Sequence, residues 1–259
     1  MRLLAIGDVC SSSGLEAVKK YLPKIKKDKS IDAVIINGEN SAESNGITVQ
    51  SAEFLFNCGA DVITGGNHSL RNESVYEYTD SNPFLLRPHN LPEAAVGKGY
   101  CLVDFGKFSM AVINLSGKIY LERTGAENPF YCADELISKA KEDNADIIVV
   151  DFHAEATSEK LALAYYLDGK VSAVFGTHTH VQTADEQILP LGTGYITDLG
   201  MTGPKDSVLG VKKSIIINRL RDNDLSKFVF ADNEASFCGC IFDIDLLTKK
   251  TVYVERINF

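Results

Sequence analysis

The chain lacks the sequence features that mark secreted and membrane-spanning proteins. No window approaches the roughly 20 apolar residues needed to cross a bilayer. The opening run M-R-L-L-A-I-G-D meets an acid within eight residues, which suits a first strand better than a secretion signal. The six cysteines are scattered and none forms a C-x-x-C pair, so no disulfide framework is indicated. We therefore expect a cytoplasmic protein with free thiols and no membrane contact.

Positive charge is also scarce. The chain has 26 basic and 35 acidic residues, and its net charge is −9. The basic surface that nucleic-acid-binding proteins carry is therefore missing, and we expect no binding to duplex nucleic acid. An anionic substrate would have to be attracted by local charge, for example by a bound metal.

The apolar segments are of two kinds, short continuous runs typical of buried strands and segments with helical spacing. Hydrophobic residues make up 45% of the 259 residues, which is enough to bury a core without disulfides. Short runs rich in Val and Ile predict buried strands at residues 2–6, 32–37, 61–64, 146–152 and 171–175. Apolar residues at helical spacing predict helices from Leu15 to Ile25 and at residues 48–58, 133–142 and 158–167.

The C-terminal third is expected to be mostly strand. Its predicted strands are at residues 194–197, 214–220, 236–244 and 251–257. Earlier in the chain, residues 100–105 and 108–115 predict a hairpin. Alternating strands and helices followed by antiparallel strands indicate an α/β fold with two packed sheets and helices outside. We expect a single domain over residues 1–259.

Polar residues that commonly bind metals directly follow five of the strand-like runs. They are Asp8; Glu39 and Asn40; Asn67 and His68; His153; and His178 and His180. Each alone could be a turn, cap or structural residue, but four of the five histidines belong to this set. Because ligands of α/β sheets bind at the carboxyl ends of the strands, the joint pattern predicts one metal centre.

The donor types in this set restrict the metal. His178 and His180 would point to the same side of an extended backbone. Oxygen and imidazole donors without sulfur suit iron, manganese or zinc and do not select among them. The set is larger than one ion needs, so we expect two ions bridged by Glu39. Their charge exceeds that of Asp8 and Glu39, so the site would attract a phosphate ester.

The order and spacing of five motifs resemble a known family. They are G-D-V at 7–9, I-N-G-E-N at 36–40, G-N-H at 66–68, D-F-H-A-E at 151–155 and G-T-H-T-H-V-Q-T-A-D at 176–185. This series is similar to the calcineurin-like metallophosphoesterases, and in detail to their bacterial YmdB-type phosphodiesterase branch. Two departures from the wider superfamily are features of that branch: Cys10 replaces the histidine of D-x-H, and Glu39 replaces the usual bridging aspartate.

The resemblance implies a four-layer α/β/β/α sandwich, a homo-oligomer and a centre of two metal ions, iron or manganese, with zinc as a further option. It implies that one ion is held by Asp8, Glu39, Asn40 and His180. The second would be held by Glu39, Asn67, His153 and His178. His68 would bind no metal and would act as the general acid.

The implied function is a metal-dependent phosphodiesterase acting on small nucleotides, including 2',3'-cyclic and 3',5'-cyclic ones. A hydroxide bridging the two ions would attack phosphorus while His68 protonates the leaving oxygen. One alternative is a phosphomonoesterase or nucleotidase with the same metals, which a basic side chain such as Arg71, Arg87 or Lys205 near the pocket would favour. Another is a non-catalytic, metal-binding regulatory protein, although such a protein would have no need of His68.

Two loops and one histidine lie outside this series. The glycine-bearing segments 41–47 and 200–205 could line the mouth of the site, although turn formation alone explains their composition. His89 lies outside every motif and is expected on a surface loop.

Overall fold

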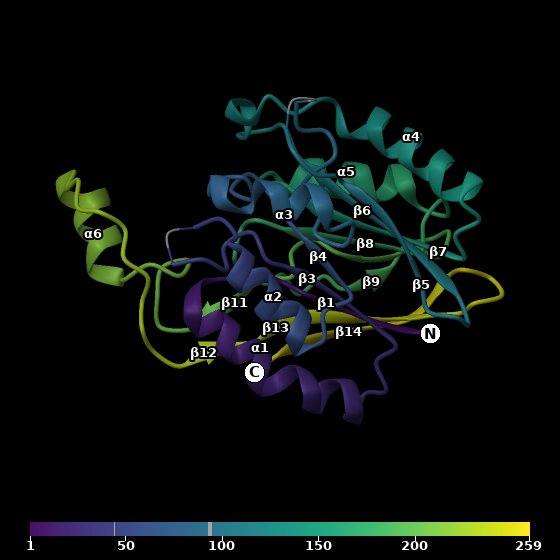
Figure 1. The fold of residues 1–259 in the computed structure, drawn as a ribbon, viewed down its shortest axis with the longest axis horizontal. Coiled ribbons are helices and arrows are strands. Elements are labelled where there is room, and N and C mark those ends of the chain that lie inside the picture. Colours follow the sequence, from purple (N-terminus) through teal and green to yellow (C-terminus); the bar gives the residue numbers. More distant parts are fainter. Residues whose placement is uncertain (44, 93–94) are drawn as a thin grey trace.

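In the computed structural model, which describes residues 1–43, 45–92 and 95–259, two sheets lie face to face between two layers of helices (Figure 1). The first sheet has the order β14-β13-β1-β3-β4. Its strands are β1 (Arg2–Ile6), β3 (Ala33–Asn37), β4 (Val62–Thr64), β13 (Cys238–Ile244) and β14 (Thr251–Asn258). Strands β1, β3 and β4 run parallel, and β13 pairs with β1 in the antiparallel direction.

The second sheet has the order β5-β6-β7-β8-β10-β9. Its strands are β5 (Tyr100–Asp104), β6 (Ser109–Ser116), β7 (Ile147–His153), β8 (Ala173–Thr177), β9 (Gln187–Ile188) and β10 (Gly194–Ile196). Strands β6, β7, β8 and β10 are parallel, and β5 and β6 form the predicted hairpin. A small third sheet contains β2 (Asp8–Val9), β11 (Met201–Pro204) and β12 (Ala235–Ser236).

Alternating side chains of the central strands fill both faces of each sheet. In β1, Leu3 and Ala5 pack between the two sheets, whereas Leu4 and Ile6 pack beneath the helices. This period of two follows from the pleat of the strand, and it explains why the strands are apolar without a polar face. The expected four-layer α/β/β/α sandwich is confirmed.

Four long helices cover the outer faces. Figure 1 places α1 (Ser11–Asp28) and α2 (Val49–Cys58) against one side and α4 (Pro129–Glu142) and α5 (Thr157–Leu167) against the other. Pro23 lies inside α1, and the helix continues through it. Shorter helices are η1 (Glu73–Val75), α3 (Tyr76–Ser81) and η2 (Glu122–Thr124). Among the helices of the described ranges, none has both the length and the apolarity that a bilayer crossing requires.

The predicted strand at residues 214–220 is wrong, because this segment forms the helix α6 (Lys213–Asp222). Three consecutive isoleucines favoured a strand, but no residue of α6 is buried and no sheet edge receives the segment. Arg219 and Arg221 stand in the last turn, where they interact favourably with the helix dipole, and Asn223 ends the helix in the left-handed conformation. Figure 1 shows α6 standing apart from the sandwich.

His89 lies in a turn between α3 and β5, outside the helices and strands, and is half-buried. Its backbone N–H donates to the carbonyl of Asn114 in β6 at 2.7 Å, which holds the segment against the second sheet.

Candidate metal centre

The carboxyl ends of parallel strands from both sheets meet at one edge of the sandwich. Asp8 follows β1, Glu39 follows β3 and Asn67 follows β4. From the second sheet, His153 is the last residue of β7, and the H-x-H pair follows β8. Every residue named for the site at the sequence level lies in one continuous group of contacts, as the distances below describe.

Glu39 lies in the middle of this group and is almost fully buried. Its Oε1 is 3.3 Å from His153 Nε2 and 3.4 Å from His68 Nδ1. The same oxygen accepts a hydrogen bond from Asn40 Nδ2 at 2.9 Å, and Oε2 accepts one from the backbone N–H of His68 at 3.0 Å. One carboxylate thus faces residues from both candidate ligand sets.

Asp8, Asn40 and His180 form one side of the group. His180 Nε2 is 3.2 Å from Asn40 Nδ2 and 3.9 Å from Asp8 Oδ1. Asp8 Oδ2 accepts the backbone N–H of His178 at 3.1 Å, which ties the first strand to the H-x-H segment.

Asn67, His153 and His178 form the other side. His153 Nε2 is 3.0 Å from both Asn67 Oδ1 and His178 Nδ1. Ligand atoms of Glu39, His153 and His178 all lie within 4.8 Å of one another, which is close enough to share one ion. His153 is completely buried.

Two buried oxygens in the group have no hydrogen-bond partner among the described residues. They are Asp8 Oδ1 and Asn40 Oδ1. A buried polar atom without a partner costs about 1–3 kcal/mol, more when it is charged, so such atoms are rare unless a ligand meets them. Carboxylate and amide oxygens beside imidazoles fit iron, manganese or zinc. The residues present therefore fit the metal centre that the fold family implies.

The electrostatics of the group also favour a bound cation. Burial alone would lower the pKa of His153, but Glu39, Asp8 and Asp151 outweigh it and raise the pKa to about 9. Burial, together with His153, lowers the pKa of His178 to about 3, so this imidazole is neutral. The buried carboxylates thus stabilise positive charge next to a neutral imidazole, and a metal ion would take the place of the proton on His153.

The orientation of His153 depends on residues that sequence reasoning missed. His153 Nδ1 lies 2.9 Å from Thr177 Oγ1, and this hydroxyl donates to Asp151 Oδ1 at 2.8 Å. The single hydroxyl hydrogen is used by Asp151, so Thr177 must accept the hydrogen of Nδ1. The lone pair of Nε2 then points into the group, as a metal ligand requires. The alternation D-F-H was a usable signal, because it places Asp151 and His153 on one face of β7.

The H-x-H segment is fixed by a buried ion pair. Lys160 Nζ is 2.6 Å from Asp198 Oδ2, and both side chains are 1% exposed. Asp198 Oδ2 also accepts the backbone N–H of Thr179 at 3.1 Å, between the two histidines. His178 and His180 have φ angles of 103° and 63°, which side-chain-bearing residues rarely adopt. Backbone strain of this kind persists only where surrounding contacts hold it.

A cavity of about 380 Å³ lies in front of the group. Glu39, His68, His178 and His180 contribute to its inner wall. His68 borders this space with a side chain that is 32% exposed. Of the two loops expected at the mouth, segment 41–47 contributes Asn45, whereas residue 44 lies outside the described residues. Segment 200–205 instead contains strand β11.

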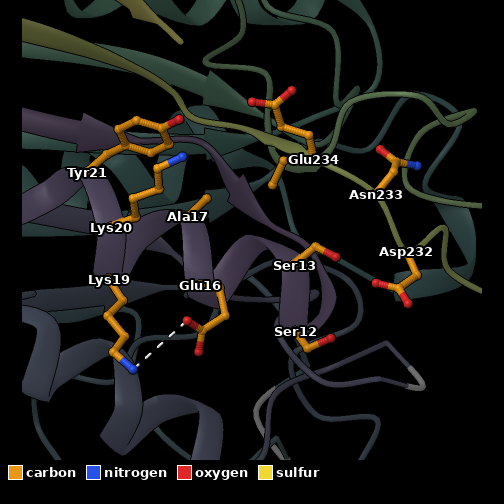
Figure 2. Close-up of a pocket in the computed structure, with 11 residues that line it drawn as sticks. Ser12, Ser13, Glu16, Ala17, Lys19, Lys20, Tyr21, Asp232, Asn233 and Glu234 are labelled. Carbon is orange, nitrogen blue, oxygen red and sulfur yellow. Dashed lines mark ion pairs between the residues drawn. The ribbon is translucent and has the colours of Figure 1, made fainter.

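A larger cavity, of about 710 Å³, lies elsewhere, between α1 and residues 232–235. Figure 2 shows its side chains, which carry charges of both signs. Glu16 and Lys19 form an exposed pair at 3.9 Å there. None of the candidate ligands borders this cavity, so the smaller one is the candidate active site.

Over residues 4–257 the chain matches the model of a family described as YmdB-like protein. The chain belongs to the YmdB-like family. The resemblance expected from the five motifs is therefore confirmed.

Relatives of this YmdB-like chain have names that describe an activity. The chain is 48% identical over 257 residues to the 2',3'-cyclic-nucleotide 2'-phosphodiesterase of Bacillus subtilis (strain 168), covering 99% of this chain and 96% of the relative. The crystal structure of a novel phosphatase from Mycoplasma pneumoniae has a TM-score of 0.94 at 34% identity, covering 100% of this chain and 93% of that one. Both names describe phosphoester hydrolases, which is the enzyme class expected from the sequence.

A more distant structure shares the fold alone. The 5'-nucleotidase precursor from Thermus thermophilus has a TM-score of 0.62 at 12% identity, covering 100% of this chain and 54% of that one.

Proposed function

We propose that this YmdB-like protein is a metal-dependent phosphodiesterase that hydrolyses small nucleotide phosphodiesters, with 2',3'-cyclic nucleotides as the first candidates and 3',5'-cyclic ones as the second. One observation carries the proposal: strand-end donors from both sheets are in mutual contact around buried oxygens of Asp8 and Asn40 that lack partners among the described residues. The name of the Bacillus subtilis relative supports a cyclic substrate.

Two ions, iron or manganese with zinc as a further option, would be held at this site. Asp8, Asn40 and His180 would hold one and Asn67, His153 and His178 the other, with Glu39 between them. The distances within each set support this division. When bound, such ions supply Lewis acidity and the positive charge that a phosphoryl group needs.

His68 would supply the proton for the leaving oxygen. Its Nδ1 lies 3.4 Å from Glu39 Oε1, so this side of the ring faces the carboxylate and Nε2 is left for the substrate. A positioned imidazole is well suited to protonate an alkoxide at neutral pH. The 32% exposure of the His68 side chain, against complete burial of His153, supports a role toward substrate instead of toward metal.

Three further expectations belong to the same proposal. We propose one domain over residues 1–259, because the candidate ligands come from both sheets. A homo-oligomeric assembly and a cytoplasmic location are proposed on the family resemblance and on the free cysteines of the described chain.

A phosphomonoesterase is the second candidate, and the phosphatase from Mycoplasma pneumoniae is the observation that favours it. Of the three basic residues considered, Arg87 is buried and donates to the carbonyls of Pro88, His89 and Ala95. Lys205 borders neither the candidate active-site cavity nor its neighbour. Arg71 borders the neighbouring cavity. Comparing bis(p-nitrophenyl) phosphate with p-nitrophenyl phosphate as substrates separates the two activities.

The experiment that tests the proposal combines metal analysis with turnover on the same preparations. We expect His68→Ala to keep its metal and to lose roughly 100-fold or more in kcat, the usual contribution of a general acid. Asp8→Ala should instead lose metal and activity together. The half-buried His89→Gln serves as the histidine control and should keep both. Equal loss of metal in His68→Ala would make His68 a ligand, and absence of turnover on any phosphoester by fully loaded enzyme would favour a regulatory protein.

A further inference from the structure

An arm formed by residues 205–233, which includes α6, borders the cavity in front of the candidate centre. Its base is fixed to the centre, because Leu209 O lies 3.2 Å from His180 Nδ1. The two limbs of the arm are joined by a bridge between Val211 and Phe230 and by a hydrogen bond from Ala231 N to Gly210 O at 2.8 Å. The arm therefore holds Phe230 at a fixed position relative to His180.

The wall that the arm presents to this cavity is apolar and aromatic. Phe228 and Phe230 border the same cavity as Glu39, His68 and His180. Phe228 is 55% exposed, although burying an aromatic ring is normally favourable. The guanidinium of Arg219 lies 4.3 Å from the centroid of the Phe228 ring and helps to fix the ring in place. A flat apolar surface thus stands beside a polar centre, and a nucleotide has the matching parts, a flat base and a phosphate.

A second cavity of about 390 Å³ adjoins the first one. The two share Asn45, Val211, Phe228 and Phe230 as border residues. Each is within the size range of small-molecule sites. The second cavity is also bordered by Arg71, Lys227 and the acid Glu43. Within the described part of the chain, neither Arg71 nor Lys227 forms an ion pair. Two cations without an acidic partner among the described residues therefore lie beyond the aromatic wall.

We propose that the arm forms a nucleoside subsite, in which a base stacks on Phe228 and Phe230 while Arg71 and Lys227 bind a phosphate on the 5' side of the same nucleoside. The substrate class that fits is a nucleoside with phosphate on both sides, as at the 3' end of a short single-stranded RNA that ends in a 2',3'-cyclic phosphate. This inference rests on the proposed phosphodiesterase function and adds the part of the substrate that lies away from the centre.

Three cyclic phosphodiesters test the two parts of the subsite separately. Glycerol 1,2-cyclic phosphate has no base, 2',3'-cyclic AMP adds the base, and 5'-phosphoadenosine 2',3'-cyclic phosphate adds the second phosphate. We expect kcat/KM of the wild type to rise about tenfold at each addition, as stacking and a charged contact each provide. Hydrolysis of all three with equal kcat/KM would overturn the inference alone, whereas hydrolysis of none by metal-loaded enzyme would overturn the proposed function.

Variants assign each gain to its residues. In Phe228→Ala, kcat/KM for 2',3'-cyclic AMP divided by kcat/KM for glycerol 1,2-cyclic phosphate should fall about tenfold. Phe228→Tyr should restore this ratio. In Arg71→Gln/Lys227→Gln the gain from the 5'-phosphate should be lost while the gain from the base remains. Lys205→Gln, on the same arm but bordering neither cavity, is the matched charge control and should behave as wild type. An equal fall of kcat/KM for all three esters in Phe228→Ala would overturn the base assignment.

A binding measurement gives a readout that does not depend on turnover. By calorimetry, adenosine 3',5'-bisphosphate should bind about tenfold more tightly than adenosine 3'-monophosphate. The Arg71→Gln/Lys227→Gln variant should bind both equally. Equal affinities in the wild type would contradict a phosphate site at Arg71 and Lys227.

Discussion

Among single residues, Glu39 connects the two halves of the candidate centre. Its Oε1 faces His153 and His68 at 3.3 and 3.4 Å and accepts from Asn40 at 2.9 Å. Although burial opposes ionisation, His153 and then His68 hold the pKa of Glu39 well below its usual range. The carboxylate is therefore charged at neutral pH and available to cations on either side.

Gly66 lies so close to the candidate ligands that no side chain fits at this position. A Cβ at this position would lie 2.2 Å from Glu39 Oε2 and 2.3 Å from His153 Nε2. We predict that Gly66→Ala displaces these side chains, so that the purified variant loses most of its metal by elemental analysis. Far-ultraviolet circular dichroism should show that the fold is retained. Full metal loading in this variant would mean that the site tolerates the shift and that Glu39 and His153 do not share an ion.

At the level of elements, the loop after β8 carries two of the candidate ligands and depends on a side chain from α5. Lys160 reaches from α5 to Asp198, and this pair holds the backbone of Thr179. Helix α5 thus has a structural function for the centre as well as for the core.

We predict that Lys160→Met lowers the free energy of unfolding by about 3–5 kcal/mol, because it leaves the buried charge of Asp198 without its partner. Chemical denaturation measures this change, and metal content should fall with it. The matched control is Lys170→Met, whose pair with Asp134 has side chains that are 39% and 47% exposed. That change should cost about 0–1 kcal/mol. Similar losses in both variants would contradict the role of burial.

How well an element could be predicted from the sequence depended on its packing. Residues 2–6 were predicted as a strand and form β1, because the two sheet faces that bury Leu3 and Leu4 select an apolar strand. Segment 214–220 is also rich in isoleucine, but it has no core to pack against. Its isoleucines therefore did not distinguish a strand from a helix, and the segment folds as α6. Strand ends could place Asp8, Glu39 and the histidines at one edge. They could not show the hydrogen bond from His153 to Thr177, which depends on the register between β7 and β8.

For the molecule as a whole, stability should depend on pH through a histidine outside the centre. Burial lowers the pKa of His89, although Glu135 opposes the shift. The folded state therefore favours neutral His89, whereas the unfolded chain takes up a proton near the ordinary value of about 6.5. The stabilisation from this group is present above that value and is lost as the pH falls through it.

We predict that the free energy of unfolding falls more steeply between about pH 7.5 and about pH 5 in the wild type than in His89→Gln. Urea denaturation of both proteins across this range provides the measurement. The other ionisable groups are common to both proteins, so the difference between the curves isolates His89. Parallel curves would show that its pKa is not lowered in the folded protein.

The candidate ligands come from both halves of the sandwich, with Asp8 and Glu39 following strands of one sheet and His153 and His178 belonging to the other. Any ion bound by ligands from both sheets would link the two halves of the sandwich. Its binding energy would then add to the free energy of folding. A cell short of that metal would then lose the polypeptide to proteases as well as losing its catalysis. The abundance of the protein in the cell would then rise and fall with the supply of that metal.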